Sequence, residues 1–276
     1  MSNLIISNPV VSVSWLHSNI NAENLIILDA SIPKVTGDNA SNLELQIPKA
    51  RFFDLKMAFS NTSAPFPTTF PSEAQFTKSA QALGINKNSA IVVYDEQGIY
   101  SSARAWWLFK AMGHDNVAVL NGGLPEWIKA GYKTQSKIEN NASIGNFQAH
   151  YKPGFMKYFD DVKIASSKKS HLIMDARSEA RFKSLEAEPR AGLRSGTIPN
   201  SVNLPFEDLL NGNVLISEEE IKTKFKQLAK KEEAIIFSCG SGITACVLAL
   251  GADIAGYKNI SVYDGSWTEW GSLVPE

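Results

Sequence analysis

A cysteine in a glycine-rich turn is the residue of this chain best suited to covalent chemistry. Cys239 opens the turn 239–244 (CGSGIT), which follows the apolar, β-branched run 234–237 and precedes the apolar run 245–250. A strand, a tight turn and a helix start in this order aim backbone N–H groups and the positive end of a helix dipole at one point. These surroundings favour the thiolate, which is the nucleophilic form of cysteine. The glycines of the turn let the backbone approach the sulfur closely.

Two other classes of glycine-rich site do not fit this turn. Neither nucleotide-binding pattern, GxGxxG or GxxxxGK[ST], occurs in it. Cysteine phosphatases close a similar loop with an arginine six positions after the cysteine, and that position holds Ala245. A phosphoryl dianion would meet no fixed cation there. The turn therefore favours a small group carried on sulfur over phosphate chemistry.

The same part of the chain resembles a known family. The run CGSGITA, the apolar helix after it and the run 263–270 (YDGSWTEW) are similar to those of the two-domain rhodanese family, and within it to the 3-mercaptopyruvate sulfurtransferase branch. The similarity extends from about Val11 to Trp270. It implies an enzyme built of tandem rhodanese-like domains, each a mainly parallel sheet flanked by helices.

The elements that must position Cys239 occur twice. Short apolar runs alternate with helical stretches in both halves, which by itself predicts an α/β layer structure with a mainly parallel sheet. Four short runs of the first half recur in the same order in the second half at nearly constant spacing. The runs of the first half are 27–30, 47–48, 92–95 and 121–127, and those of the second half are 172–176, 198–199, 235–239 and 264–270. This pattern indicates an internal duplication. We expect an inactive N-terminal domain over 1–135, a linker over 136–156 and a catalytic domain over 157–276.

The duplication indicates which half carries the chemistry. The position that matches Cys239 in the first half is Asp95, and its loop begins with Asp95 and Glu96. Two acids would repel an anion and cannot carry sulfane sulfur. The first half is therefore predicted to be a degenerate copy whose role is to wall one side of a cleft. A simpler role for Asp95, as a cap of the following helix, is compatible with this prediction.

Two arginines are candidates for holding a substrate carboxylate. Arg181 and Arg190 lie in the polar, loop-like stretch 181–192 (RFKSLEAEPRAG). Arginine is the side chain best shaped to hold a carboxylate through two parallel N–H bonds. The family resemblance implies that both hold the mercaptopyruvate carboxylate. The alternative is that each pairs with a local glutamate on the surface.

The remaining residues of the turn have predicted supporting roles. The N–H groups of Gly240, Ser241, Gly242, Ile243 and Thr244 are expected to stabilise the thiolate and then a persulfide. The Ser241 hydroxyl could donate to the thiolate or the substrate, or only satisfy a loop carbonyl. Thr244 is expected to cap the helix start.

Three further side chains near the turn have more modest expected roles. Cys246 is expected to be inert packing. Trp267 resembles the family's aromatic wall near the sulfur, with core packing as the equal alternative. Asp175 and Arg177, at the end of a strand, are expected to pair.

The chain departs from the mercaptopyruvate branch at two positions. That branch has an acid and a histidine in the first half, proposed to complete a serine–histidine–aspartate relay. Lys56 occupies the acid's place, and Thr68, in the proline-rich loop 61–71, lies near the histidine's place. Ser241 therefore has no evident base. Lys56 could instead bring a cation to the cleft, which is a hypothesis.

Composition limits the partners. A net charge of −1 implies no surface for nucleic acid. No run approaches 18 apolar residues, and the N-terminus lacks the pattern of a signal peptide, so we expect no membrane span and a cytoplasmic location.

Two cysteines are too few for a disulfide framework. The four histidines have no ligand spacing with one another, so we expect no metal; sulfur transfer itself needs no cofactor.

These observations predict a sulfurtransferase. Cys239 is expected to take sulfane sulfur from the small-molecule donor 3-mercaptopyruvate as a persulfide and pass it to cyanide, a small thiol or a thioredoxin-like protein. The alternatives are a thiosulfate:cyanide sulfurtransferase, and a non-catalytic persulfide carrier or regulatory rhodanese module. The acceptor, the oligomeric state and the pathway do not follow from the sequence.

Overall fold

The computed structural model describes residues 3–33, 44–138 and 142–275. They divide into two compact units, each with its own sheet. Unit 1 comprises the described residues of Met1–Asn61, Phe70–Lys152 and Gly212–Leu215, and unit 2 those of Thr62–Thr69, Pro153–Asn211 and Ile216–Glu276. Each unit thus includes a short segment from the other half of the chain: 212–215 joins unit 1, and 62–69 joins unit 2.

Unit 1 is built on a five-stranded parallel sheet with the order β1-β6-β5-β2-β4. Its strands are β1 (Val10–Val11), β6 (Val117–Leu120), β5 (Ala90–Tyr94), β2 (Leu25–Asp29) and β4 (Arg51–Phe52). The central strand β5 is buried along its whole length, as expected of a parallel strand covered on both faces. A two-stranded antiparallel pair, β3 (Leu45–Gln46) and β7 (Gln135–Ser136), completes its strand pairing.

Unit 2 repeats this plan. Its five parallel strands have the order β8-β14-β13-β9-β10. They are β8 (Met156–Lys157), β14 (Ile260–Tyr263), β13 (Ile235–Ser238), β9 (Leu172–Asp175) and β10 (Ser201–Asn203). Strand for strand, β8, β14, β13, β9 and β10 take the places of β1, β6, β5, β2 and β4. The predicted duplication and the tandem parallel-sheet α/β fold are therefore confirmed.

Helices cover both faces of each sheet. In unit 1, α1 (Val13–Asn19) and α4 (Gly123–Lys129) pack their Leu16 and Trp127 into one core. On the other face, α2 (Glu73–Ala82) and α3 (Ser102–Ala111) meet through the edge-to-face rings of Phe76 and Phe109. Ser72 caps α2 by accepting from the Gln75 N–H, and the Gln75 side chain donates to the carbonyls of residues 57, 58 and 60.

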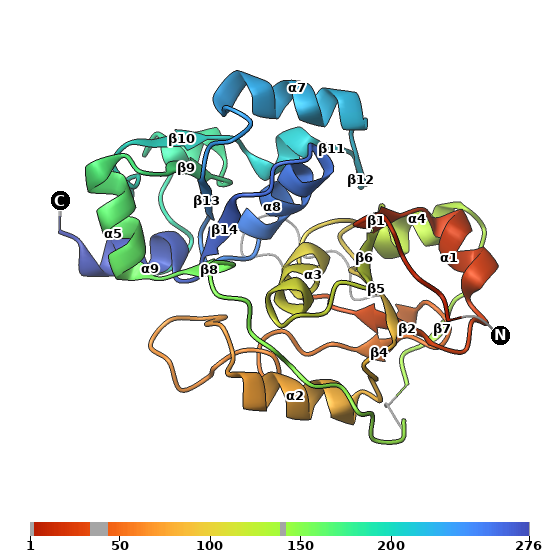
Figure 1. Cartoon of the computed structure of the whole chain (residues 1–276). Helices are drawn as coiled ribbons and strands as arrows, with labels where there is room; N and C mark the ends of the chain where they lie inside the picture. The colour runs from red at the N-terminus through yellow and green to blue at the C-terminus, as the bar shows by residue number, and fades with distance from the viewer. Residues whose placement is uncertain (1–2, 34–43, 139–141, 276) are drawn as a thin grey trace. The chain divides into compact units, whose positions relative to one another are not determined.

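The helices of unit 2 follow the same arrangement. In Figure 1, α5 (Phe159–Lys168) and α9 (Ser266–Leu273) lie on one side of the sheet, and α7 (Glu218–Leu228) and α8 (Ala245–Ile254) lie on the other. Val162 and Trp270 join α5 and α9 in one core. The helix α8 is buried from its first residue to Ala252, because it packs against β13 and β14 on one side and α7 on the other. Shorter elements of unit 2 are α6 (Glu179–Phe182), a 3-10 helix (Phe206–Leu209) and β11 (Leu210–Asn211), whereas β12 (Val214–Leu215) belongs to unit 1.

The segment predicted as a linker has a defined place where it is described. Residues 142–152 belong to unit 1, where the Ala149 N–H donates to Thr77 of α2 and the Gln81 amide donates to the Phe147 carbonyl. Residues 139–141 lie outside the described part of the chain. The assignment of separate roles to 1–135 and 157–276 stays a prediction.

Candidate active site

Cys239 lies directly after the central strand β13 of unit 2, where the chain turns toward α8. The carboxyl end of a central parallel strand is the usual place for a site in an α/β sheet. The residue exposes only 1 % of its surface. A donor therefore reaches the sulfur only when neighbouring side chains move aside.

The turn after Cys239 presents backbone N–H groups around the sulfur. The Gly242 N–H donates to Cys239 Sγ at 3.1 Å, and Gly242 has a φ of +77°, a conformation that glycine adopts without strain. Within the described residues, the N–H groups of Gly240, Ser241, Ile243 and Thr244 donate to no protein acceptor. Four unpaired amides beside a helix start form a site for an anion or a polarised sulfur.

The start of α9 holds this turn through hydrogen bonds that the sequence did not predict. The N–H groups of Trp267 and Thr268 donate to the carbonyls of Cys239 and Gly240, each at 2.9 Å. Ser266 accepts from the Cys239 N–H at 3.1 Å, and its hydroxyl lies 4.0 Å from Sγ. Ser266 is fully buried with a φ of +49°, so its backbone is strained at the site. The run YDGSW contains Ser266, but a serine in a resembling run carries no signal of its own about contact with the sulfur.

The two predicted arginines converge on the turn. A Cβ placed on Gly240 would lie 3.2 Å from Arg181 Nη2 and 3.7 Å from Arg190 Nη1. Glycine at this position therefore leaves room for both guanidinium groups beside the residue that follows Cys239. The stretch 181–192 was predicted to be loop-like, but Arg181 lies in the one-turn helix α6, so the stretch begins in a helix.

Arg181 and Arg190 differ in their partners. Arg181 donates to the buried carboxylate of Glu188 through Nε at 3.2 Å and Nη2 at 2.6 Å. Arg181 thus pairs with a local glutamate, as the alternative expected, but the carboxylate is buried and does not lie on the surface. The half-buried Arg190 side chain makes no ion pair or hydrogen bond within the described residues. Arg190 is the guanidinium available for an incoming carboxylate.

A buried ion network fixes Arg181. Arg177, predicted to pair with Asp175, donates to it at 2.7 Å and to Glu188 at 2.8 Å, and all three side chains are buried. Burial opposes the Arg177 charge, but the two carboxylates outweigh this effect and raise the pKa of the guanidinium. Charges therefore alternate from β9 to Arg181, which keeps Arg181 oriented without leaving a buried charge unpaired.

The Arg177 guanidinium lies 4.7 Å from the centre of the Trp267 ring, and Arg194 lies 4.8 Å from the same ring. Trp267 is fully buried, as its packing alternative expected.

Other predicted residues have the following positions. Ser241 is buried, yet its hydroxyl makes no hydrogen bond to another residue in the described ranges. Thr244 occupies the N-cap position of α8, but its side chain makes no capping bond, so the predicted capping role is wrong. Thr244 has a helical φ and ψ of −73° and −18°, whereas a capping side chain needs an extended backbone. Ile243 is buried, and Cys246 packs in α8 with its thiol on the Gly242 carbonyl at 3.3 Å.

Of the two departures from the family pattern, one lies at the site. Thr68 is in the 62–69 segment of unit 2, and its hydroxyl lies 2.7 Å from the Ser241 carbonyl oxygen. Lys56 is an exposed residue of unit 1, and the hypothesis that it brings a cation to the sulfur stays a prediction.

The matching loop of unit 1 is filled by its own side chain. Asp95 is fully buried and accepts from the N–H groups of Gln97 at 2.9 Å, Tyr100 at 2.9 Å and Ser102 at 2.8 Å. Ser102 is the first residue of α3, so Asp95 also caps that helix. The carboxylate thus occupies the donors that the corresponding loop of unit 2 leaves open.

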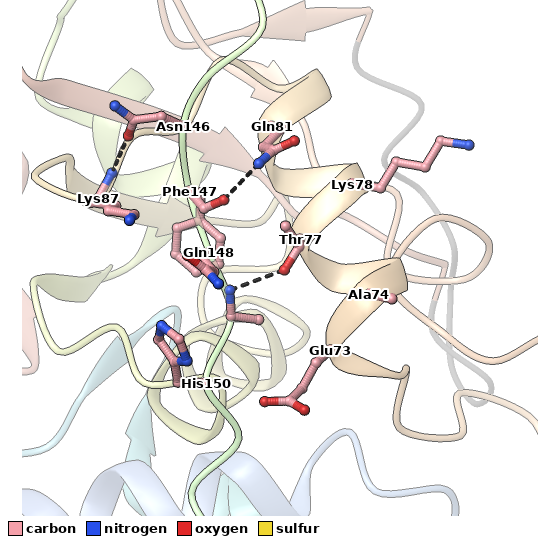
Figure 2. Close-up of a pocket in the computed structure, with 11 residues that line it drawn as sticks. Glu73, Ala74, Thr77, Lys78, Gln81, Lys87, Asn146, Phe147, Gln148 and His150 are labelled. Atoms are coloured by element: carbon pink, nitrogen blue, oxygen red, sulfur yellow. Dashed lines mark hydrogen bonds between the residues drawn. The ribbon is translucent and has the colours of Figure 1, made fainter.

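Unit 1 also has a groove beside α2 (Figure 2). Its walls are Thr77 and Gln81 on one side and Phe147 and Ala149 on the other, and the dashed contacts in Figure 2 join these walls. Its polar groups fasten the chain segment to the helix, and neither cysteine lines it. The groove is therefore separate from the chemistry at Cys239.

Neither a cluster of metal-binding side chains nor a membrane-spanning helix is present among the described residues. Among residues 3–33, 44–138 and 142–275, no group of three or more His, Cys, Asp or Glu side chains is placed to hold a metal ion. Within the same ranges, no helix has the length and apolar character needed to cross a bilayer.

Comparison with known proteins places the chain in a family. The model of the rhodanese-like domain matches it twice, over residues 12–130 and 159–273. The chain is 38% identical to thiosulfate/3-mercaptopyruvate sulfurtransferase 1, mitochondrial, of Arabidopsis thaliana, over 98% of this chain and 77% of that protein. It is 36% identical to the 3-mercaptopyruvate sulfurtransferase of Homo sapiens, over 95% and 91%.

A solved structure has the same fold. The 3-mercaptopyruvate sulfotransferase SseA of Escherichia coli superposes with a TM-score of 0.84 and 31% identity, covering 95% of this chain and 99% of SseA. The two matches to one domain model, the sequence relatives over nearly the whole chain and this superposition all agree with a fold built of two similar domains. The chain therefore belongs to the rhodanese-like family, with two copies of the domain.

Proposed function

We propose that this chain moves sulfane sulfur from 3-mercaptopyruvate to a thiol or cyanide through a persulfide on Cys239. The chain is a sulfurtransferase. The observation that carries the finer proposal is the position of Cys239 Sγ in a turn with four unpaired amides, beside two converging guanidinium groups. The relatives whose names include 3-mercaptopyruvate align over nearly the full chain, which supports this donor.

The first half-reaction is a displacement at sulfur. The Cys239 thiolate attacks the donor's sulfur, a new S–S bond forms, and the donor's C–S bond breaks. The bonding electrons pass to carbon, giving the enolate of pyruvate, which takes up a proton. Arg190, with Arg181 beside it, holds the donor's carboxylate during this step. The unpaired amides at Gly240, Ser241, Ile243 and Thr244 stabilise the charged sulfur before and after transfer.

The second half-reaction regenerates the thiolate. The acceptor's thiolate, or cyanide, attacks the outer sulfur of the persulfide, the S–S bond breaks, and Cys239 leaves as a thiolate. No external oxidant or reductant is needed, because the two electrons that sulfur gives up in the first half-reaction are taken by the donor's carbon, where the C–S bond is replaced by a C–H bond. Two steps through a covalent enzyme form give ping-pong kinetics. Ser241 has no hydrogen-bonded base among the described residues, so its proposed part is limited to donating to substrate.

The donor is tested by comparing kcat/KM for 3-mercaptopyruvate and thiosulfate with cyanide as acceptor. Gly240 and Ser241 place no cation directly after Cys239, whereas thiosulfate is a dianion, so we expect the carboxylate-bearing thiol to be preferred. A strong preference for thiosulfate would refute this donor assignment and favour the thiosulfate:cyanide alternative. The Cys239→Ser variant should lose turnover with both donors.

A carrier without turnover is distinguished by mass. Incubation with the donor should add one sulfur, about 32 Da, to the intact protein and none to Cys239→Ser. Gain of sulfur without multiple turnovers would favour a persulfide carrier or regulatory module. Access is tested in parallel, because a native protein in which iodoacetamide never labels Cys239 would contradict nucleophilic chemistry there.

The biological acceptor and location are part of the same proposal. A thioredoxin-like dithiol is the proposed protein acceptor, and the cytoplasm is the proposed location, although one relative is named mitochondrial. Multiple-turnover assays with reduced thioredoxin and with a small thiol test the acceptor. Imaging of the tagged chain in cells tests the location.

A further inference from the structure

We infer that Thr68 is a positioning residue that acts on Cys239 through one peptide group. The Thr68 hydroxyl lies 2.7 Å from the Ser241 carbonyl oxygen. The next atom along that peptide, the Gly242 nitrogen, donates its proton to Cys239 Sγ at 3.1 Å. The inference rests on the proposed function only in taking Cys239 as the nucleophile.

Peptide geometry links these two contacts. A trans peptide is planar, so its C=O and N–H point in opposite directions, and the chain has no cis bond in its described ranges. A donor that holds the Ser241 oxygen therefore fixes the direction of the Gly242 N–H, which points at the sulfur. Donation to a carbonyl also polarises its amide and strengthens the N–H as a donor. Thr68 thus stabilises negative charge on Sγ without touching it.

The hydroxyl proton has two possible acceptors. Thr68 Oγ1 lies 2.7 Å from the Pro67 carbonyl as well. A hydroxyl has a single proton, so it makes a full hydrogen bond to only one of these two carbonyls at a time. Pro67 is exposed to water, whereas Ser241 is 6 % exposed and its carbonyl has no other donor within the described residues. A buried carbonyl without a donor costs more than an exposed one. The proton is therefore assigned to Ser241.

The backbone at Thr68 supports a specific role for this side chain. Its φ of +56° lies in the left-handed region, where a β-branched residue is strained and glycine or asparagine fits better. The neighbouring Thr69 donates to the Phe66 carbonyl at 2.8 Å and so stabilises the segment itself. Thr69 provides a matched control, because its hydroxyl belongs to the same segment but does not reach the turn.

The test is the rate of Cys239 alkylation by iodoacetamide against pH, with the adduct assigned to Cys239 or Cys246 by peptide mass spectrometry. Thr68→Val should react about three- to tenfold more slowly than the wild type on the acidic side of the profile, as expected for one lost hydrogen bond. The two rates should converge at alkaline pH, where both proteins are fully thiolate. Thr69→Val should follow the wild type throughout.

A second pair keeps the test decisive if Thr68→Val does not fold. Thr68→Ser keeps the hydroxyl and Thr68→Ala removes it at the same size, so only Thr68→Ala should shift the profile. A Thr68→Val profile identical to the wild type, or a loss of rate equal at all pH values, overturns the inference. Alkylation needs no sulfur donor, so a wild-type protein that gains no sulfur refutes the proposed function and leaves the alkylation comparison to decide on Thr68.

Discussion

At the scale of single residues, Cys239 and Asp95 hold corresponding places and use the surrounding amides in opposite ways. Asp95 accepts three backbone N–H groups with its own carboxylate, so these three donors are not open to a ligand. Cys239 accepts one and leaves four unpaired in the described structure. A thiolate is larger and makes weaker hydrogen bonds than a carboxylate. In the proposed mechanism, these open amides stabilise the transferred sulfur.

Arg190 is predicted to be the main contact of the donor's carboxylate. Arg190→Gln should raise KM for 3-mercaptopyruvate roughly 10- to 100-fold, because a hydrogen bond to a charged group contributes about 1.5–3 kcal/mol. Steady-state kinetics with cyanide as acceptor provides the measurement. Lys183→Gln removes the same charge from the exposed end of the stretch and serves as the control. An unchanged KM in Arg190→Gln would rule out this contact.

At the scale of elements, two connections hold the reactive turn. The first residues of α9 donate to the carbonyls of Cys239 and Gly240. The ion network from Asp175 through Arg177 and Glu188 ties the strand β9 to Arg181. Both connections use buried polar groups that are fully paired, and such networks are rigid because every alternative arrangement leaves a charge unpaired. The sulfur and the guanidinium groups are thus fixed to the same sheet.

Glu188 pairs with both Arg177 and Arg181, so substituting it tests this network. Glu188→Gln should lower the free energy of unfolding by about 3–5 kcal/mol, because Arg177 loses a buried charged partner. It should also raise KM for the donor more than it lowers kcat, since Arg181 loses its orientation. Urea denaturation and steady-state kinetics measure the two effects. Glu186→Gln, an exposed neighbour, should change neither, and equal stability of the Glu188 and Glu186 variants would refute the role of the network.

At the scale of the whole molecule, one strand order serves two different uses. Unit 1 has the same five-strand order as unit 2, but its loop after the central strand is closed by Asp95. We predict that reactivity belongs to unit 2 and that unit 1 contributes stability, since a site with unpaired amides is a less stable arrangement than a filled one. Substitution of a buried polar residue of unit 1 is therefore expected to change the free energy of unfolding.

His114 gives unit 1 a predicted pH dependence. The ring is buried, and its Nε2 is hydrogen-bonded to the Ser89 carbonyl oxygen at 2.9 Å. Burial lowers the pKa of the ring below the ordinary 6.5. Between the folded and unfolded pKa values only the unfolded chain binds the proton, so the free energy of unfolding falls as pH drops below about 6.5. The slope from this group is at most about 1.4 kcal/mol per pH unit.

Urea unfolding at several pH values between 5 and 8 tests this prediction. His114→Gln should flatten the acidic part of the stability profile, because glutamine does not titrate. Above pH 7 the two profiles should run parallel, since the histidine is neutral there in both states. Equal acid slopes in the two proteins would show that another group causes the loss of stability.

The sequence alone determined the repeated α/β plan, and it predicted which residue is reactive. Apolar runs of strand length and repeated landmarks predicted both sheets, because a parallel strand buried on both faces must be apolar along its length. The turn of glycines around Cys239 predicted an anion-holding loop, because the order strand, turn and helix start fixes where N–H groups point. Arg181 and Arg190 were found through the resemblance together with their chemistry.

Only the tertiary structure decided which groups meet at the sulfur. Ser266 and Thr68 are 27 and 173 residues from their partners on the turn, and no local pattern encodes such contacts. The structure also paired Arg181 with Glu188, left Arg190 without a partner in the described residues, and gave Thr244 a backbone that cannot cap. Sequence patterns report local preference, whereas hydrogen-bond partners are chosen by packing across elements distant in the chain, which is why these contacts could not be predicted.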